Sequence, residues 1–398
     1  MKKNYIIIGS SAAGLSAAHK IREIDPLGSI TCVTADPEMP YNRCLLADYI
    51  SGHRGHEAIT LKNRAFFDEK KISLVLSARV TEIDREQQHV LLENGTVLAY
   101  DKLFIGSGRS SWMPDLPGTN LQGVFPFYGL HETNNILAFV KNHSVKNAVV
   151  VGAGLSGLEC ADALAQLGLQ VNVIERAHHA LPNQLNHDGG KFLASLMHKR
   201  QVTLHASNQI NEITGTSNFV AGAKLADGTT LPAQMVVFAI GGKVNSDFAQ
   251  SAGLSMFGHG IVVDEFMQTS DHNIFAGGDV CAVPDLLTGH LVQSCLWADA
   301  AQQGMAAGSS MAGVERKYLG SLIVSSSHIY GTTFVTCGPV TNPPAHLKQH
   351  VRQGPDFYHV YLTDGNQLKG FAMIGKVDNV GLLRKKLLDK TEFVVPGT

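Results

Sequence analysis

Three glycines lie close together in the stretch Gly152-Ala-Gly154-Leu-Ser-Gly157, directly after the apolar run 148–151. In a strand-to-helix turn, the first glycine of such a set allows the tight turn and the second lets the backbone approach a pyrophosphate. The third lets the helix pack closely on the strand. The start of the helix adds unpaired N–H groups and a positive dipole end. The spacing therefore predicts a dinucleotide-binding turn.

An acidic residue follows this turn at a distance that suits a ribose. Glu175 directly follows the next apolar run, 171–174, and lies 23 residues after Gly152. A carboxylate there accepts hydrogen bonds from a ribose 2′-hydroxyl and repels a 2′-phosphate. The sequence thus predicts that NADH is preferred to NADPH, a preference that the neighbouring Arg176 moderates.

The same plan occurs in weaker form near the N-terminus. Residues 4–14 read Asn-Tyr-Ile-Ile-Ile-Gly-Ser-Ser-Ala-Ala-Gly, so Gly9 and Gly14 are kept and Ser11 takes the middle place. Serine is small enough to permit the approach of a phosphate, and Asp36 stands one residue past the place expected for the acid. Two strand–turn–helix–strand units in one chain predict two dinucleotide-binding domains of the α/β class.

The composition excludes several other classes of protein. The chain has 398 residues, of which 44% are hydrophobic and 17% charged, so it can form more than one buried core. The 32 Lys and Arg residues are balanced by 34 Asp and Glu residues, which argues against a nucleic-acid partner. No apolar stretch reaches the length of a membrane span or a secretory signal. The six cysteines lack the spacing of a disulfide framework or a zinc site, so we expect a reduced, cytoplasmic protein without a metal.

Four further segments are similar to parts of one family. Residues 100–108 and 235–242 are similar to the two strand-to-turn segments by which the chain leaves each nucleotide domain. Residues 269–279 are similar to the segment whose final Asp holds the ribityl chain of FAD, and residues 40–52 to the loop and helix beside the flavin. The chain resembles the FAD-dependent pyridine nucleotide–disulfide oxidoreductase superfamily over about residues 4–312, and more loosely beyond. Within it, the nearest groups are the NADH:rubredoxin and ferredoxin reductases and the flavoprotein part of assimilatory nitrite reductases.

The resemblance implies an α/β fold with two Rossmann-like, three-layer nucleotide-binding domains and a small α+β C-terminal domain. The NAD domain, residues 113–245, is inserted in the FAD domain, which consists of residues 1–112 and 246–312. The C-terminal domain takes residues 313–398.

The resemblance also implies which residues contact the cofactors, FAD and NADH. Asp279 is expected to accept a ribityl hydroxyl, with a helix-capping role as the alternative. Trp297 is expected to open a helix whose positive end lies near the flavin pyrimidine ring, with a buried core tryptophan as the alternative. The other expected FAD contacts are Gly9, Ser11, Ala12, Gly14, Asp36, Arg43, Val80, Ser107 and Gly108. The expected NAD contacts are Gly152, Gly154, Gly157, Glu175 and Gly241.

Glu159 is the first candidate catalytic residue. In related reductases a glutamate at this place lies between nicotinamide and flavin, often paired with a lysine of the flavin-side helix. That lysine position corresponds here to Asp48. Two carboxylates cannot share a buried site unless one of them is protonated. The resemblance therefore implies a nicotinamide-site role for Glu159 and leaves its partner open.

Cys44 is the second candidate catalytic residue. NADH oxidases, NADH peroxidases and coenzyme A-disulfide reductases carry one redox-active cysteine at this place, whereas most rubredoxin and ferredoxin reductases carry proline. A helix N-terminus and the neighbouring Arg43 would stabilise its thiolate, which could cycle through a sulfenic acid or a mixed disulfide. The alternative is a small apolar residue that fills the interior.

Three functions remain open from the sequence. The leading one is an NADH-dependent flavin reductase, monomeric or homodimeric, that passes electrons to a rubredoxin- or ferredoxin-like protein. The basic stretch 384–386 could contact an acidic carrier of this kind, although a solvated helix face is the favoured interpretation. The second function reduces coenzyme A disulfide, polysulfide, oxygen or peroxide by way of Cys44. The third is non-enzymatic, as an NADH-sensing flavoprotein or as a subunit of a larger reductase.

Overall fold

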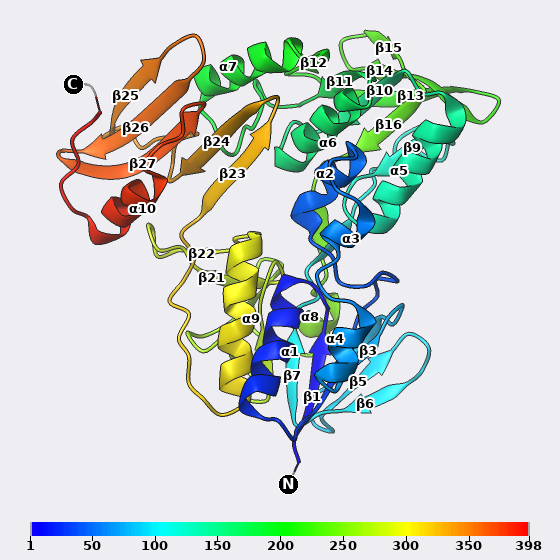
Figure 1. Ribbon diagram of the computed structural model, residues 1–398, viewed down its shortest axis with the longest axis vertical. Helices are drawn as coiled ribbons and strands as arrows, with labels where there is room; N and C mark the ends of the chain where they lie inside the picture. Colours follow the sequence, from blue (N-terminus) through cyan, green and yellow to red (C-terminus); the bar gives the residue numbers. More distant parts are fainter. Residues whose placement is uncertain (1, 397–398) are drawn as a thin grey trace. The chain divides into compact units, whose positions relative to one another are not determined.

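The computed structural model of the chain describes residues 2–396, which fall into two compact units (Figure 1). Unit 1 comprises Met1–Leu45, Gly55–Ser110 and Gly242–Leu322, and unit 2 comprises Leu46–Arg54, Ser111–Gly241 and Ile323–Thr398. The chain therefore leaves and re-enters each unit more than once.

A parallel sheet of five strands forms the centre of unit 1. Its strands are β1 (Asn4–Ile8), β2 (Ser29–Val33), β3 (Ile72–Val75), β7 (Lys102–Ile105) and β20 (Ile274–Ala276). They pair in the order β20-β7-β1-β2-β3, and every pairing is parallel. The central strands β1 and β7 are buried along most of their length, as expected of parallel strands in an α/β protein.

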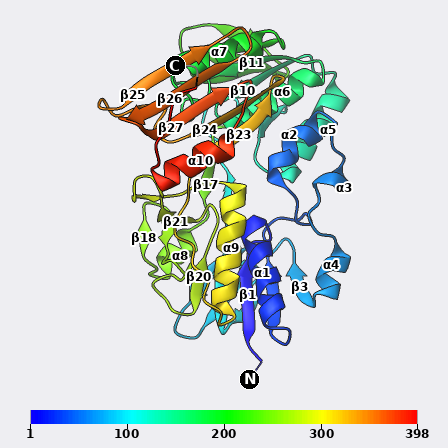
Figure 2. The same cartoon turned by 60° about the vertical axis from the view of Figure 1, so that its left-hand side comes forward.

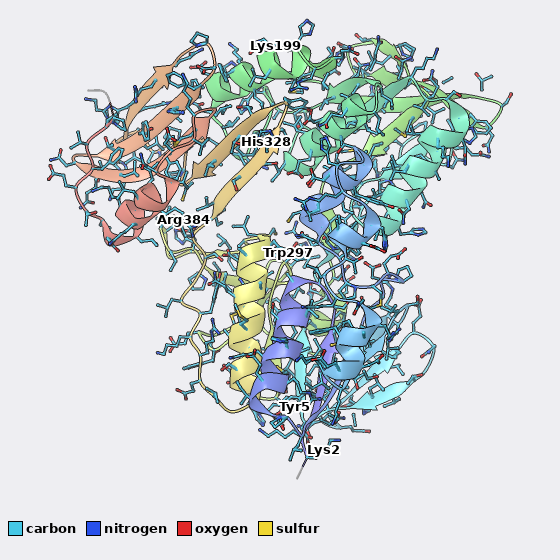
Figure 3. The ribbon with its side chains drawn as sticks, in the orientation of Figure 1. Lys2, Tyr5, Lys199, Trp297, His328 and Arg384 are labelled. Carbon is cyan, nitrogen blue, oxygen red and sulfur yellow. The ribbon has the colours of Figure 1, made fainter. Side chains whose placement is uncertain are left out.

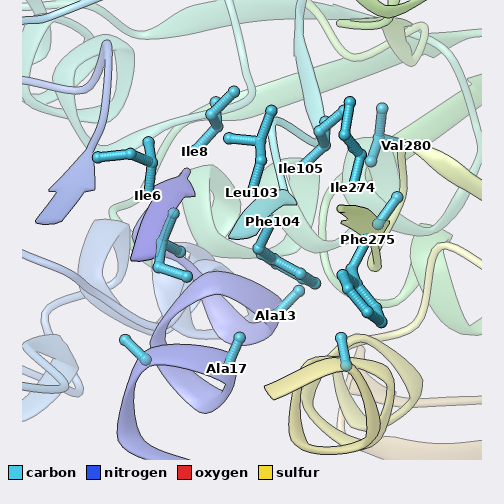
Figure 4. Packing of buried hydrophobic residues seen from close by; sticks show 14 of the residues in the cluster. Ile6, Ile8, Ala13, Ala17, Leu103, Phe104, Ile105, Ile274, Phe275 and Val280 are labelled. Carbon is cyan, nitrogen blue, oxygen red and sulfur yellow. The ribbon is translucent and has the colours of Figure 1, made fainter. Parts of the chain in front are cut away.

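Two helices of unit 1, α1 (Ala12–Ile24) and α9 (Trp297–Met311), lie side by side (Figures 1 and 2). A side chain at Gly304 would place its Cβ 2.1 Å from the carbonyl oxygen of Ala13. Only glycine permits such an approach, so the glycine- and alanine-rich sequence of α9 is a requirement of this packing. Ala13 and Ala17 lie among the buried side chains of the strands (Figure 4).

Shorter elements complete unit 1. The helical ones are the 3-10 helix η1 (Arg43–Leu45), α3 (His56–Ile59), α4 (Arg64–Glu69) and α8 (Asp247–Ser251). The strands outside the central sheet are β4 (Val80–Asp84), β5 (His89–Leu92), β6 (Val97–Ala99), β8 (Arg109–Ser111), β17 (Gly242–Val244), β18 (Met256–Phe257), β19 (Gly260–Val262), β21 (Cys281–Pro284) and β22 (Leu291–Val292).

Unit 2 repeats the parallel-sheet plan. Its five-stranded sheet consists of β9 (Val124–Pro126), β10 (Asn147–Val151), β11 (Gln170–Ile174), β12 (Val202–His205) and β16 (Met235–Phe238). The strands pair in the order β12-β11-β10-β16-β9, all in parallel. The helices are α2 (Leu46–Ile50), α5 (Leu130–His143), α6 (Leu155–Gln166) and α7 (His187–His198). An antiparallel sheet is formed by β13 (Ile210–Thr216), β14 (Phe219–Leu225) and β15 (Thr230–Pro232).

The C-terminal part of unit 2 is an antiparallel sheet with one helix. Its strands are β23 (Val324–Ile329), β24 (Thr332–Cys337), β25 (Lys348–Gln353), β26 (Tyr358–Asp364) and β27 (Gln367–Ile374), in the order β23-β24-β27-β26-β25. Helix α10 (Val380–Asp389) packs on β27 and buries Leu383 and Leu387 (Figure 2). The buried Tyr330, which follows β23, donates from its hydroxyl to the carbonyl of Leu158, 3.1 Å away on α6.

The predicted fold class is confirmed, because two parallel Rossmann-like sheets and a small α+β part are present. The predicted division of the chain into an FAD, an NAD and a C-terminal domain stays a prediction. Within residues 2–396, no helix has the length and apolar character needed to cross a membrane.

Candidate functional site

The three glycines of unit 2 occupy the turn between β10 and α6, and each meets a different demand. Gly152 has a φ of +106°, and a Cβ there would lie 2.6 Å from the carbonyl oxygen of Ala239. A Cβ on Gly157 would lie 2.0 Å from the carbonyl oxygen of Gly152, so helix and turn meet closely. No heavy atom lies within 4 Å of the Cβ position of Gly154, the residue before the first turn of α6. The open space beside a helix start fits a pyrophosphate.

Glu175 lies next to this turn, directly after β11. Its carboxylate accepts hydrogen bonds from the N–H of Ala153, at 2.7 Å, and of Ala177, at 2.8 Å. A carboxylate has about four lone-pair positions, so these two bonds leave capacity for a ribose hydroxyl. Gly241, after β16, has a φ of +91° and an open Cβ position. The described residues of unit 2 therefore fit a dinucleotide.

Glu159 lies on α6, and its polar partner is Ser327 of β23. The Ser327 hydroxyl donates to Oε1 of Glu159 at 2.6 Å. Burial raises the pKa of Glu159 to about 7, the hydrogen bond from Ser327 opposes this rise, and the negative charge of Asp48 adds to it. Asp48 itself is 44% exposed and pairs with Arg54 at 3.2 Å. The partner that the sequence left open is thus a serine, while Asp48 pairs with Arg54 of its own segment.

In unit 1, the turn after β1 has the geometry of a phosphate-binding turn. Gly9 has a φ of +96°, and a Cβ there would lie 2.2 Å from the carbonyl oxygen of Gly106. A Cβ on Gly14 would lie 1.9 Å from the carbonyl oxygen of Gly9. Ser11 precedes α1 without capping it through its side chain, and Ala12 is the first helical residue. The first N–H groups of α1 are therefore not capped by that side chain and can serve a phosphate.

Asp36 and Arg43 are brought together in unit 1. Asp36 follows β2, and its Oδ2 lies 3.4 Å from Nη2 of Arg43 and accepts a hydrogen bond from Tyr41. Val80 is the buried first residue of β4. The roles of Asp36, Arg43 and Val80 in FAD binding stay predictions.

Ser107 and Gly108 follow β7, where the chain passes from unit 1 toward unit 2. The Ser107 hydroxyl donates to the carbonyl of Asn245 at 2.7 Å, and the Asn245 amide donates back to the carbonyl of Ser107 at 3.0 Å. Gly108 has a φ of +59° and an open Cβ position. Asn245 thus ties together two distant stretches of unit 1, a role that no motif in the sequence indicated.

Asp279 lies in the turn between β20 and β21. The preceding Gly278 donates its N–H to Oε1 of Gln303 on α9 at 2.7 Å, which holds the turn against that helix. Within residues 2–396 the Asp279 carboxylate accepts no hydrogen bond, and burial raises its pKa against the opposing charges of Arg109 and Arg43. The helix-capping alternative for Asp279 is wrong, because a strand and not a helix follows it.

Two buried polar atoms of unit 1 find no partner within the described part of the chain: Nε of Arg109 and Oδ2 of Asp299. Buried polar atoms are normally hydrogen-bonded, so such orphans indicate a group that the protein is built to receive. Together with the unsatisfied carboxylate of Asp279, they fit a ligand that carries both hydroxyls and ring heteroatoms, as FAD does. Neither Arg109 nor Asp299 belonged to any motif of the sequence.

Trp297 is the first residue of α9 (Figure 3). Its side chain is partly buried and packs against the apolar core of unit 1. Trp297 is therefore not a buried core residue, which was the alternative. Its predicted place beside the flavin stays a prediction.

Cys44 lies in η1, directly before α2. Its side chain is exposed and its N–H donates to Oδ1 of Asn42 at 3.0 Å. The alternative of an apolar residue that fills the interior is wrong, since such a role requires burial. Cys32, Cys160, Cys281 and Cys337, by contrast, are buried. Among residues 2–396, no cluster of three His, Cys, Asp or Glu side chains could hold a metal ion.

Comparisons with known proteins agree with this geometry. The sequence profile of a family described as pyridine nucleotide-disulphide oxidoreductase matches residues 3–304. The NADH oxidase of Methanocaldococcus jannaschii is 31% identical over 319 residues, which are 79% of this chain and 71% of that protein. The nitrite reductase [NAD(P)H] of Bacillus subtilis is 29% identical over 378 residues, 94% of this chain and 46% of that protein. The chain thus spans about half the length of such relatives.

A solved structure similar to the whole chain is the ferredoxin reductase for the CYP199A2 system from Rhodopseudomonas palustris. It superposes with a TM-score of 0.89 at 25% sequence identity, covering 99% of this chain and 96% of that protein. The likeness therefore includes the C-terminal sheet.

Proposed function

The chain belongs to the pyridine nucleotide-disulphide oxidoreductase family, and from this premise we propose that it oxidises NADH and passes the electrons to a small rubredoxin- or ferredoxin-like protein. Family membership confirms the predicted oxidoreductase class, with FAD and a pyridine nucleotide as its cofactors. The preference for NADH over NADPH, the acceptor, the reduced cytoplasmic setting and the oligomeric state belong to the proposal.

Each unit holds one nucleotide in this proposal. In unit 2, the N–H groups at the start of α6 bind the pyrophosphate of NADH, Glu175 accepts a ribose hydroxyl, and Glu159 lies at the nicotinamide. In unit 1, the turn at Gly9 binds the FAD pyrophosphate and Asp279 accepts a ribityl hydroxyl. Bound FAD supplies an acceptor that takes two electrons at once and can release them singly.

The observation that supports a protein as the electron acceptor is the full-length similarity to a ferredoxin reductase. In addition, the six cysteines lack the spacing that would hold an iron–sulfur cluster, so the chain has no second carrier of that kind and electrons must leave it. A one-electron carrier protein suits a flavin that releases electrons singly.

A second candidate function rests on the exposed Cys44. An accessible thiol beside Arg43, in a chain 31% identical to an NADH oxidase, suits reduction of a disulfide, polysulfide, oxygen or peroxide. In this alternative Cys44 would be a second redox centre.

An anaerobic titration with NADH tests the proposal. We expect one equivalent of NADH to bleach the visible flavin absorbance of the purified holoprotein, and oxidised rubredoxin or ferredoxin then to restore it. If about two equivalents are consumed, or if only a disulfide, polysulfide or peroxide restores the absorbance, the Cys44 alternative replaces the proposal. If NADH changes the spectrum but no acceptor is reduced, the protein is a sensor or a subunit rather than a complete reductase.

A further inference from the structure

The contact between Ser327 and Glu159 is fixed on both sides by Tyr330. The hydroxyl of Tyr330 donates to the carbonyl of Leu158, and its N–H donates to Oδ2 of Asp162 at 2.9 Å. These two anchors lie on α6 immediately before Glu159 and one turn after it. Ser327 is also held by β24, the antiparallel partner of its strand. The 2.6 Å hydrogen bond between Ser327 and Glu159 is thus imposed by the packing of β23 on α6.

The groups around Glu159 do not neutralise it. From α2 it faces Asp48, a like charge, which itself pairs with Arg54. From β23 it faces an uncharged hydroxyl, and the ionisable residue of that strand, His328, is hydrogen-bonded to Thr333 through Nδ1.

The other titratable groups near α6 are also engaged or uncharged. Asp162 is engaged with Tyr330 and Gln166, and burial raises the pKa of Cys160 so that its thiol stays neutral. Among the strands that pack on α6, β10 and β11 carry no ionisable side chain. β12 carries His205, whose pKa burial lowers and which bonds to Asn172. Burial raises the pKa of Glu159 to about 7, and within residues 2–396 no cation forms an ion pair with it, so its proton is retained to near-neutral pH.

The nicotinamide ring changes its charge in the reaction, since it is neutral in NADH and cationic in NAD⁺. Building on the proposed place of Glu159 at this ring, we propose that the Glu159–Ser327 pair senses the charge of the bound nicotinamide and releases a proton when the ring is cationic. The step is Glu159–COOH plus NAD⁺ giving Glu159–COO⁻·NAD⁺ plus a proton to solvent. No electron moves, and the Ser327 hydroxyl donates to the new carboxylate.

This pairing links product binding to pH. Above neutral pH, Glu159 is an anion before the ligand arrives and attracts the cationic ring. Below neutral pH, the neutral acid offers the ring no counter-charge, so NAD⁺ binds more weakly and leaves more readily. Ser327 favours the anion, and loss of its hydroxyl therefore raises the pH at which this change occurs.

Calorimetry on the oxidised, FAD-loaded protein tests the proposal without turnover. NAD⁺ is titrated at pH 6.5 in buffers of different ionisation enthalpy, with ADP-ribose as the matched ligand that lacks the nicotinamide ring. If NAD⁺ lowers the pKa of Glu159 from about 7 to about 6, about half a proton is released per NAD⁺ bound. Binding of ADP-ribose should release distinctly less. A Glu159→Gln variant should lose the difference between the two ligands.

Variants on β23 separate a positioning role from a structural one. Ser327→Ala should move the pH of maximal proton release upward, Ser327→Thr should restore it, and Ser326→Ala, at the exposed neighbour, should leave it unchanged. Equal proton release with both ligands, or unchanged release in Glu159→Gln, overturns the inference while the proposed function stands. Failure of NADH to bleach the flavin overturns the proposed function instead.

Discussion

The carboxylate of Glu175 accepts a hydrogen bond from the N–H of Ala153, 2.7 Å away in the glycine turn that precedes it by 22 residues. The second carboxylate oxygen binds the N–H of Ala177. The acid is therefore part of the turn as well as a candidate acceptor for a ribose hydroxyl. Substitutions of Glu175 can distinguish the effect of its charge on coenzyme preference from the effect of its hydrogen bonds on stability.

Replacing Glu175 should weaken discrimination between the two coenzymes. In Glu175→Ala we expect the ratio of kcat/KM for NADH to that for NADPH to fall about tenfold, which corresponds to about 1.4 kcal/mol of lost repulsion. Glu175→Gln keeps an acceptor for Ala153 but removes the charge, so it should show a similar fall with better retained stability. An unchanged ratio in both variants would mean that Glu175 does not face the ribose.

Two glycines of the same turn should respond differently to alanine. Gly157→Ala places a Cβ 2.0 Å from a backbone oxygen, so we expect a loss of about 1–3 kcal/mol in stability, seen as a lower melting temperature. Gly154→Ala meets no neighbouring atom and has a normal φ of −73°, so the protein should fold normally. Its NADH dissociation constant should nevertheless rise about tenfold, because the added methyl group occupies the place of the pyrophosphate. Equal melting temperatures for the two variants would refute this division of roles.

Asp279 should control retention of FAD. Asp279→Ala removes a half-buried carboxylate that lacks a donor from the described residues, so we expect less FAD per chain after gel filtration. The apoprotein should keep its fold, since no internal hydrogen bond of that carboxylate is lost. Asp68→Ala, at an exposed position of α4 in the same unit, is the matched control and should retain FAD fully. FAD content equal to wild type in Asp279→Ala would exclude the ribityl contact.

The raised pKa of Glu159 makes stability depend on pH. The folded state holds this proton up to about pH 7, whereas the unfolded chain releases it near pH 4.5. The stabilisation is thus complete below pH 4.5 and is lost as the pH rises through 7, by on the order of 1–3 kcal/mol. Glu159→Gln should therefore gain in melting temperature relative to wild type between pH 5 and pH 8. The exposed Asp378→Asn should run parallel to wild type, and a parallel course for Glu159→Gln would show that its carboxyl titrates normally.

Cys44→Ser separates the two proposed acceptor classes. Reduction of rubredoxin or ferredoxin should keep most of its rate in this variant, because electrons pass from the flavin without a thiol. Reduction of coenzyme A disulfide or polysulfide, if the wild type performs it, should disappear. Measuring both rates with NADH in excess decides the matter, and loss of carrier reduction in Cys44→Ser would reverse our ranking.

The turns and their flanking elements could be predicted because their residue types recur at fixed spacing. The apolar runs at 148–151 and 171–174 are β10 and β11, and the glycines between strand and helix have the close contacts that their spacing indicated. These features depend on neighbours within a few residues of one another, which is the range that sequence patterns report.

Contacts between distant segments could not be predicted in the same way. Ser327 meets Glu159 across 168 residues, and Gln303 meets Gly278 through the packing of a helix on a turn. Serine and glutamine occur on most protein surfaces, so nothing in their type marks a partner. The helix-capping alternative for Asp279 is wrong for a related reason. A Gly-Gly-Asp turn can precede either a helix or a strand, and here the strand β21 follows it.

The two hydrogen bonds from residues 327–330 to the acids of α6 also limit how this fold can be recombined. A chimera that takes its C-terminal sheet from another parent would have to supply a hydroxyl opposite Glu159 and an N–H opposite Asp162. Without these donors, Glu159 would lose the hydrogen bond from Ser327, and Asp162 would keep only the one from Gln166, at a cost of about 1–3 kcal/mol for each lost bond. The stretch 155–166 and the strand β23 should therefore be inherited from the same parent.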